Sequence, residues 1–166
     1  KATTGISGTM QGKGWVCGGC ESPNNIVDTI QVFSFDSGEQ NASDWGELSA
    51  TSGNNVGHND ATNGFIDRNS GGPGNQSNQT NNRDTFALAS AGNGTDSGEC
   101  VTGITFDRAK PGGISATHGY SCLGYKTPGP PYGGDFMEKF AFASPYNGAD
   151  VGEAPADGYG GMGASD

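Results

Sequence analysis

The residues best suited to chemistry in this sequence are four cysteines, two of which stand close together as Cys17 and Cys20 in the segment CGGC. A C-x-x-C pair can act as a redox centre or as half of a zinc site. Cys100 and Cys122 do not form a second C-x-x-C, and no βαβ pattern surrounds the first, so neither function is favoured. We instead predict structural disulfides among the four, since each bridge contributes about 2 to 4 kcal/mol to a chain with few core residues. Three pairings remain open.

The two histidines offer no clear catalytic partner. His58 and His118 each precede a glycine and an aromatic residue, in GHNDATNGF and ATHGY, which predicts related loop positions. A nucleophilic serine would need a strained turn of the type G-x-S-x-G, and this motif does not occur. We therefore predict a protein that is not an enzyme and has no catalytic residues.

Oxygen-bearing side chains in HNDATNGFIDRN could bind calcium. The candidate ligands are Asp60, Asn63 and Asp67, which offer the hard oxygen atoms that this ion prefers. The spacing of a calcium-binding EF-hand loop is absent, and the same residue types are typical of turns. No cofactor is predicted, and calcium at these three residues is the alternative.

Composition limits the class of partner. The 166 residues carry a formal net charge of -10 and only 8 Lys and Arg residues, whereas nucleic acids and anionic membranes attract clustered basic residues. No apolar run approaches the 18 residues that could span a bilayer. The 31 glycines disfavour helices, because glycine costs about 1 kcal/mol relative to alanine in a helix.

Three landmarks recur in the same order and indicate a threefold repeat of about 50 residues. The landmarks are a glycine-aromatic start, an alternating apolar run and an Asp-x-Gly-Glu element. The starts are GWVCGG at Gly14, GFIDRN at Gly64 and GYSCLG at Gly119; the runs begin at Asp28, Asp84 and Met137; the last elements are SDWGE, TDSGE and ADVGE. We predict one domain, 1–166, with a closing segment at 1–13 and repeats at 14–63, 64–118 and 119–166.

The repeats predict an all-β fold. Their alternation has a period of two, as in strands with one buried face, and Asp-x-Gly-Glu has turn chemistry. The segment TGISGTMQGKGW resembles GGISATHGY, so the N-terminal strand is expected to complete the last unit, as in circular folds. We predict propeller-like blades, with a three-sheet β-prism or β-trefoil as the alternative.

Repeated positions supply the candidate structural residues. They are Trp15, Phe65 and Tyr120 at the starts, and Asp44, Gly46, Asp96, Gly98, Asp150 and Gly152 in the turns. Trp45 has no aromatic counterpart, so we expect it to pack beside a turn against an adjacent sheet. The three starting aromatic residues are expected to pack in the core, and the alternative is that they stack on glycans.

One family shares this pattern. The first repeat resembles kelch-like repeats of predicted structural proteins from tailed bacteriophages, notably marine and cyanobacterial ones. The best matches are Gly14, Trp15, Gly18, Gly19, Asp28, Ile30, Phe33, Phe35, Ser43, Asp44, Gly46 and Leu48. The second and third repeats match less strongly, and the second has DRNSGGPGNQSNQTNN in place of the double-glycine connection.

The resemblance implies a virion component: a tail fibre, spike or capsid-surface knob that contributes to assembly and host attachment. We therefore expect extracellular virus particles as its location, and as partners a symmetric oligomer of itself, other virion proteins and a host-surface glycan. No nucleic acid and no membrane insertion are expected. The alternative function is a carbohydrate-binding, lectin-like module.

Overall fold

The computed structural model describes residues 4–8, 12–22, 25–36, 41–53, 55–68, 81–101, 112–125 and 133–158. Every regular element in them is a β-strand, which confirms the predicted all-β class. None of these residues forms a helix of the length and apolarity that crossing a membrane requires.

The strands form three antiparallel sheets, each built from four strands that follow one another along the chain. The first sheet contains β1 (Thr4–Gly8), β2 (Lys13–Ser22), β3 (Asn25–Ser34) and β4 (Ser43–Glu47). The second contains β5 (Val56–Asn59), β6 (Asn63–Asp67), β7 (Asn82–Ala87) and β8 (Thr95–Glu99). The third contains β9 (Gly112–Ile114), β10 (His118–Tyr125), β11 (Gly133–Ala141) and β12 (Ala149–Gly158).

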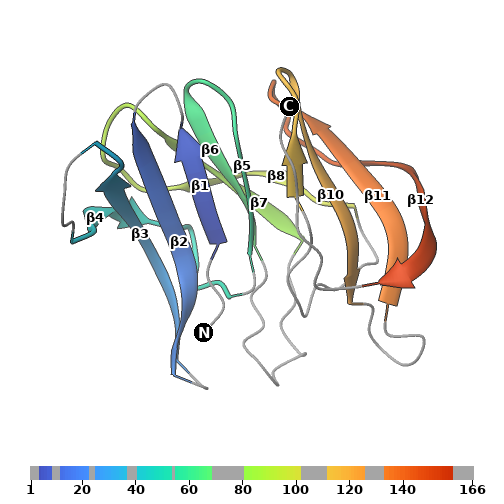
Figure 1. Ribbon diagram of the computed structural model, residues 1–166, viewed down its shortest axis with the longest axis horizontal. Coiled ribbons are helices and arrows are strands. Elements are labelled where there is room, and N and C mark those ends of the chain that lie inside the picture. Colours follow the sequence, from blue (N-terminus) through green and yellow to red (C-terminus); the bar gives the residue numbers. More distant parts are fainter. Residues whose placement is uncertain are drawn as a thin grey trace.

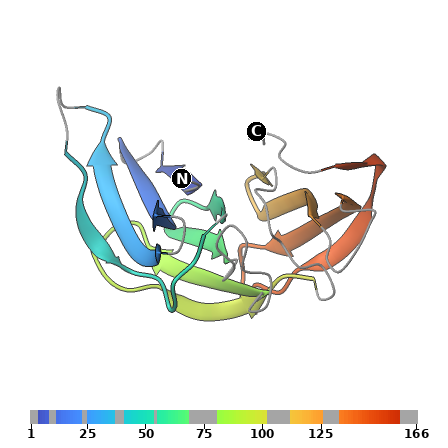
Figure 2. The ribbon, with the colours of Figure 1, turned by 90° about the horizontal axis from the view of Figure 1, so that it is seen from below.

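The three sheets follow one another around an arc. Figure 1 shows them side by side, and Figure 2 shows β1, β5 and β9 on the concave side with β4, β8 and β12 on the convex side. The inner strands contact one another, β1 with β5 and β5 with β9. The first and third sheets face each other across the open side of the arc (Figure 2).

Each sheet begins one strand earlier than the predicted repeat. β1 lies in the predicted closing segment 1–13, yet it pairs with β2 and so starts the first sheet; the expectation that it completes the last unit is wrong. Likewise, β5 and β9 fall at the ends of the predicted repeats 14–63 and 64–118 but begin the second and third sheets. The glycine-aromatic element therefore marks the second strand of a sheet.

A glycine faces a phenylalanine across the second and third strands of every sheet. The pairs are Gly14 with Phe33, Gly64 with Phe86, and Gly119 with Phe140. A Cβ atom on any of these glycines would lie 2.2 to 2.5 Å from the nearest ring atom. The glycine recurs because the ring lies directly over it and leaves no room for a side chain.

The Asp-x-Gly-Glu element forms a strand, so the predicted turn is wrong. Its copies lie in β4, β8 and β12, and each sheet has a one-residue bulge against this strand at the same place. The shifts fall between Ile30 and Gln31, Arg83 and Asp84, and Met137 and Glu138. Gly152 has a positive φ of 148°, which suits glycine. Turn-forming residue types thus serve a β-bulge.

Neighbouring sheets meet through the same hydrogen bonds at both junctions. At the first, the amide of Glu47 donates to Asn93 Oδ1 (3.2 Å), and its carbonyl accepts from the amide of Gly94 (2.7 Å). At the second, Glu99 makes the same two bonds with Asn147 (3.0 Å) and Gly148 (2.7 Å). The junction between sheets is therefore repeated along with the sheet itself.

Trp45 bridges the first two sheets. It is half-buried, and its indole N–H donates to the carbonyl of Ala87 at 3.1 Å. Its ring meets that of Trp15 edge-on, with 5.8 Å between centroids. It packs against a core shared by both sheets: Ile6, Trp15, Cys17, Ile30, Val32, Leu48, Ile66, Phe86 and Leu88.

Candidate functional site: a buried charge cluster

A cluster of charged side chains is buried between the second and third sheets, with Arg83 at its centre. The guanidinium donates through Nε to Asp67 Oδ1 (2.6 Å) and through Nη2 to Glu138 Oε1 (2.5 Å). Nη1 donates to the carbonyl of Tyr146 at 2.6 Å, and the group lies 3.5 Å from the centroid of the Phe140 ring. Neither Arg83 nor Glu138 has any exposed surface. The bonds and the ring together hold the arginine in one orientation.

Burial lowers the pKa of Arg83, but the nearby acids outweigh this effect. Asp67 contributes most, by charge and by its hydrogen bond, and Cys100 and Glu138 also favour the cation, so the net shift of the pKa is upward. Arg83 is therefore a permanent buried cation.

His58 and Ser121 extend the cluster from Asp67. Ser121 Oγ donates to Asp67 Oδ2 at 2.7 Å, while His58 Nε2 lies 3.1 Å from the same hydroxyl oxygen and 3.5 Å from Asp67 Oδ2. His58 Nδ1 lies 3.3 Å from the carbonyl of Gly113. Because Ser121 donates its proton to the carboxylate, its hydroxyl oxygen is left to accept a hydrogen bond from the imidazole.

Arg83 is the cation of the cluster, and the carboxylates of Asp67 and Glu138 both bond to it. A serine, a histidine and an aspartate lie together here, but Ser121 donates to the acid and not to the histidine. A nucleophilic serine requires the opposite arrangement, so this geometry favours a structural role.

The first and third sheets have uncharged residues at the positions that His58, Asp67 and Arg83 occupy in the second sheet. The strand pairing matches His58, Asp67 and Arg83 to Ile6, Cys17 and Ile30 in the first sheet, and to Gly113, Cys122 and Met137 in the third. His58, Asp67 and Arg83 therefore belong to the middle sheet alone, whereas Glu138 comes from the third sheet.

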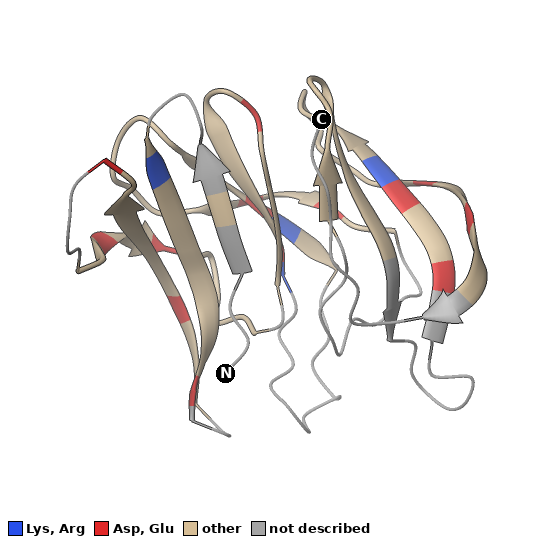
Figure 3. Cartoon of the chain, in the orientation of Figure 1, with Lys and Arg blue, Asp and Glu red and all other residues tan. Residues whose placement is uncertain are grey.

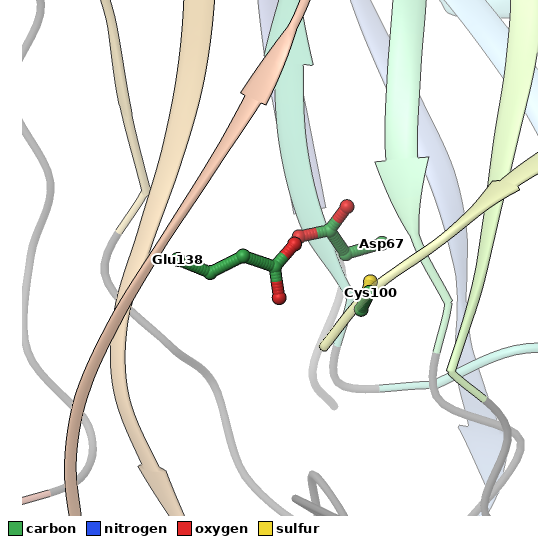
Figure 4. Close-up of side chains that lie close together, drawn as sticks. All are labelled: Asp67, Cys100 and Glu138. Carbon is green, nitrogen blue, oxygen red and sulfur yellow. The ribbon is translucent and has the colours of Figure 1, made fainter. Parts of the chain in front are cut away.

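Asp67, Cys100 and Glu138 also form the candidate metal group of the described residues. One ligand atom from each lies within 4.8 Å of the other two (Figure 4). The Arg83 guanidinium already bonds to both carboxylates, and its Nη2 lies 3.6 Å from Cys100 Sγ. A metal cation would have to displace this buried positive charge, so the group fits an ion pair better than a metal centre.

A second buried ion pair lies between the first and second sheets. Arg68 Nε donates to Asp84 Oδ1 at 2.7 Å. Asp84 also accepts from the amide and the hydroxyl of Ser49, at 2.7 and 2.8 Å. At the junction of the second and third sheets, the amide of Val101 makes the equivalent bond by donating to Glu138 Oε2 at 2.9 Å. Each junction thus buries one carboxylate that accepts a backbone amide of the preceding sheet.

The proposed calcium ligands do not converge. Asp60 Oδ1 accepts from the amides of Thr62 and Asn63, at 2.7 and 2.6 Å, and so closes the turn between β5 and β6. Asp67 lies at the far end of β6 from Asn63, about 13 Å along the strand, and faces the buried cluster. Turn formation therefore accounts for Asp60.

Two of the three starting aromatic residues have no exposed surface. Trp15 and Phe65 are fully buried, whereas Tyr120 is only partly buried. Because a ring must be accessible to stack on a sugar, Trp15 and Phe65 cannot do so in this fold. The aspartates Asp44, Asp96 and Asp150 are all exposed on the outer strands, and the charges of these strands are shown in Figure 3.

No disulfide joins any of the four cysteines, all of which lie in the described part of the chain, so the predicted bridges are not supported. Cys17 and Cys20 lie on the same strand, Cys100 lies in the charge cluster and Cys122 lies in the third sheet. Hydrogen-bonded charge clusters and aromatic packing between sheets provide the cross-connection that we had expected from disulfides. His58 and His118 are not in related positions either, since His58 lies within β5 and His118 begins β10.

We expect alkylating reagents to label Cys122 first in the native protein. Cys122 is half-buried, whereas Cys17, Cys20 and Cys100 are buried. Only the thiolate reacts, and burial raises the pKa of Cys17 to about 12 and also that of Cys122, so the greater exposure of Cys122 determines the expected order. Iodoacetamide labelling followed by peptide mass spectrometry would measure the order. All four thiols should react in urea without reductant, and protection of any pair there would restore the disulfide hypothesis.

The fold and the cluster define an all-β protein of repeated sheets whose buried charges bond to one another. No known family model matches the chain, and no curated protein sequence matches it.

Proposed function

We propose that this chain is a non-enzymatic structural protein of a virion, built from three propeller-like blades, which acts by assembling with other proteins. A blade of this kind is a four-stranded antiparallel sheet arranged with others around a centre. The contacts of β1 with β5 and of β5 with β9 support blades over a prism or trefoil, because the first strands line one inner side.

One observation carries the proposal: the same junction joins the first sheet to the second and the second to the third. Repeat proteins of this type bury their surfaces between neighbouring units, and in the described part of the chain the two outermost sheets each have one side without a neighbouring sheet (Figure 2). The buried ionisable groups support a structural function, because Arg83, Asp67 and Glu138 bond to one another within the protein.

The acidic surface favours an extracellular, soluble particle component over a nucleic-acid partner. Exposed acidic residues lie on the outer strands toward both ends of the arc, Asp44 and Glu47 on β4 and Asp150 and Glu153 on β12 (Figure 3). Together with the resemblance to phage structural proteins, this charge supports a tail fibre, spike or capsid-surface knob, with host attachment as its contribution.

We expect peptides of this chain to copurify with phage particles. Mass spectrometry of density-gradient-purified virions from a phage that encodes the sequence would detect them at a ratio to the major capsid protein that stays constant across the particle peak. An antibody to the chain would then locate it on tail or capsid and test whether it blocks adsorption. Peptides found only in the infected-cell lysate, and never in the particle peak, would contradict the proposal.

A further inference from the structure

Within the described residues, the repeated aromatic position shows which side of the third sheet is covered less than the same side of the second. Phe65 is fully buried because residues of the third sheet cover it: its ring lies 5.1 Å from that of Phe142 and 5.5 Å from that of Phe140. Tyr120 is the counterpart of Phe65 in the third sheet, and it remains partly exposed.

The residues that would cover Tyr120 are present in the first sheet. Phe33 and Phe35 occupy the positions of Phe140 and Phe142. Their rings meet edge-on with 5.2 Å between centroids, and Phe35 is 55% exposed. An aromatic pair with one exposed ring, that of Phe35, therefore lies at one end of the arc, and an incompletely covered tyrosine lies at the other.

The outer strand of the third sheet has room for the backbone contact made at the internal junctions. A Cβ atom on Gly46 would lie 2.3 Å from the carbonyl oxygen of Gly92, and one on Gly98 would lie 2.7 Å from that of Tyr146. At the corresponding Gly152, the space within 4 Å of a Cβ holds none of the described atoms. Beside it, Val151 is 49% exposed.

The two ends also differ from the internal junctions in matching ways. The internal carboxylates Asp84 and Glu138, which accept a backbone amide, correspond to Gln31 in the first sheet. The donors Ser49 and Val101 correspond to Pro155, which has no N–H. Pro155 at the third-sheet end thus cannot donate a backbone hydrogen bond, and Gln31 at the first-sheet end carries no charge. A junction between these two ends would therefore bury no carboxylate that lacks an amide donor.

We propose that two copies of this chain bind head to tail, the first sheet of each covering the third sheet of the other, to close a ring of six sheets. The proposal rests on the assembly function above and names its partner and surface. Phe35 then packs near Tyr120 of the second copy, and Asn41, the counterpart of Asn93 and Asn147, faces the outer strand at Glu153. Six blades lie within the four to eight of known propellers.

Sedimentation velocity at about 0.15 M salt should give a species of twice the chain mass of 16.8 kDa. Lower salt should weaken the dimer. Each copy carries a net charge of -10, and the repulsion between the two copies grows when fewer ions screen their charges. A monomer at all concentrations, or a ladder of species beyond the dimer, would overturn the closed ring of two copies.

Variants at the two ends test the head-to-tail direction. Phe35→Asp and Val151→Asp each alter an exposed side chain, so the fold should persist, and each should raise the dissociation constant at least about 30-fold, as for a central interface residue. Ala61→Asp adds the same charge at an exposed position in the turn between β5 and β6 of the second sheet. This control should leave the dissociation constant unchanged. Circular dichroism and melting would show that all three variants are folded.

Mixing the two interface variants gives the sharpest readout. A head-to-tail mixed dimer contains one unaltered junction, formed by the first sheet of the Val151→Asp chain and the third sheet of the Phe35→Asp chain. A second aspartate costs little at a junction that the first has already opened, so the mixture should associate more strongly than either variant alone, and absence of any gain would overturn the arrangement. A dimer without virion peptides would contradict only the proposed function, whereas virion peptides with a monomeric chain would contradict only the ring.

Discussion

Replacing Arg83 with isoleucine should lower the free energy of unfolding by about 3 to 5 kcal/mol, the usual cost of removing one partner from a buried ion pair. The loss is large because Asp67 and Glu138 remain buried with no cation between them. Isoleucine is the residue that the first sheet has at this position, as Ile30, so the side chain itself suits the fold.

A neutral version of the cluster provides the control. Adding Asp67→Asn and Glu138→Gln to Arg83→Ile removes the stranded charges and should recover a large part of the loss, since uncharged replacements of buried ion pairs are often tolerated. Urea titrations followed by circular dichroism would measure all three stabilities. If the triple variant were as unstable as the single one, charge balance would not be the reason.

Replacing Phe65 with alanine should cost about 3 to 5 kcal/mol, as expected for a large aromatic side chain removed from a packed core. Its ring contacts Phe140, Phe142 and Tyr146, all of which belong to the third sheet or the loop before β12. The change therefore weakens the junction between the second and third sheets as well as the core of the second.

Tyr120→Ala at the corresponding position is the matched control. Measured in the Phe35→Asp background to suppress association, it should cost only about 1 to 2 kcal/mol, because less apolar area is buried there. Chemical unfolding of both variants in that background makes the comparison direct. Equal losses would mean that the junction does not determine the burial of this position.

The repeat and the all-β class could be predicted from the sequence because their landmarks lie in the second, third and fourth strands, where spacing is regular. The first strand of each sheet could not, since TGISG, VGHN and GGI are short and have only one glycine in common at matching positions, Gly5, Gly57 and Gly112. The boundaries therefore fell one strand late.

The charge cluster was missed because the runs were aligned on Asp28 and Asp84. The strand pairing shows instead that Asp84 corresponds to Gln31, three residues further on. In that alignment Arg83 occupies the position of the apolar residues Ile30 and Met137. The sequence would then have shown one charged residue at a core position of the repeat. A β-bulge changes the face of the sheet to which the following side chains point, and the alternation of apolar residues alone does not reveal it.

The restriction of the buried arginine to one sheet bears on how three similar units keep their order during folding. If the third sheet docked directly on the first, Glu138 would be buried where Ile30 replaces Arg83, and its carboxylate would lack the cation that it meets in the native order. An uncompensated buried charge costs several kcal/mol. Arg83 thus discriminates against a chain that skips its middle unit, a hazard for tandem sheets whose contacts are otherwise nearly interchangeable.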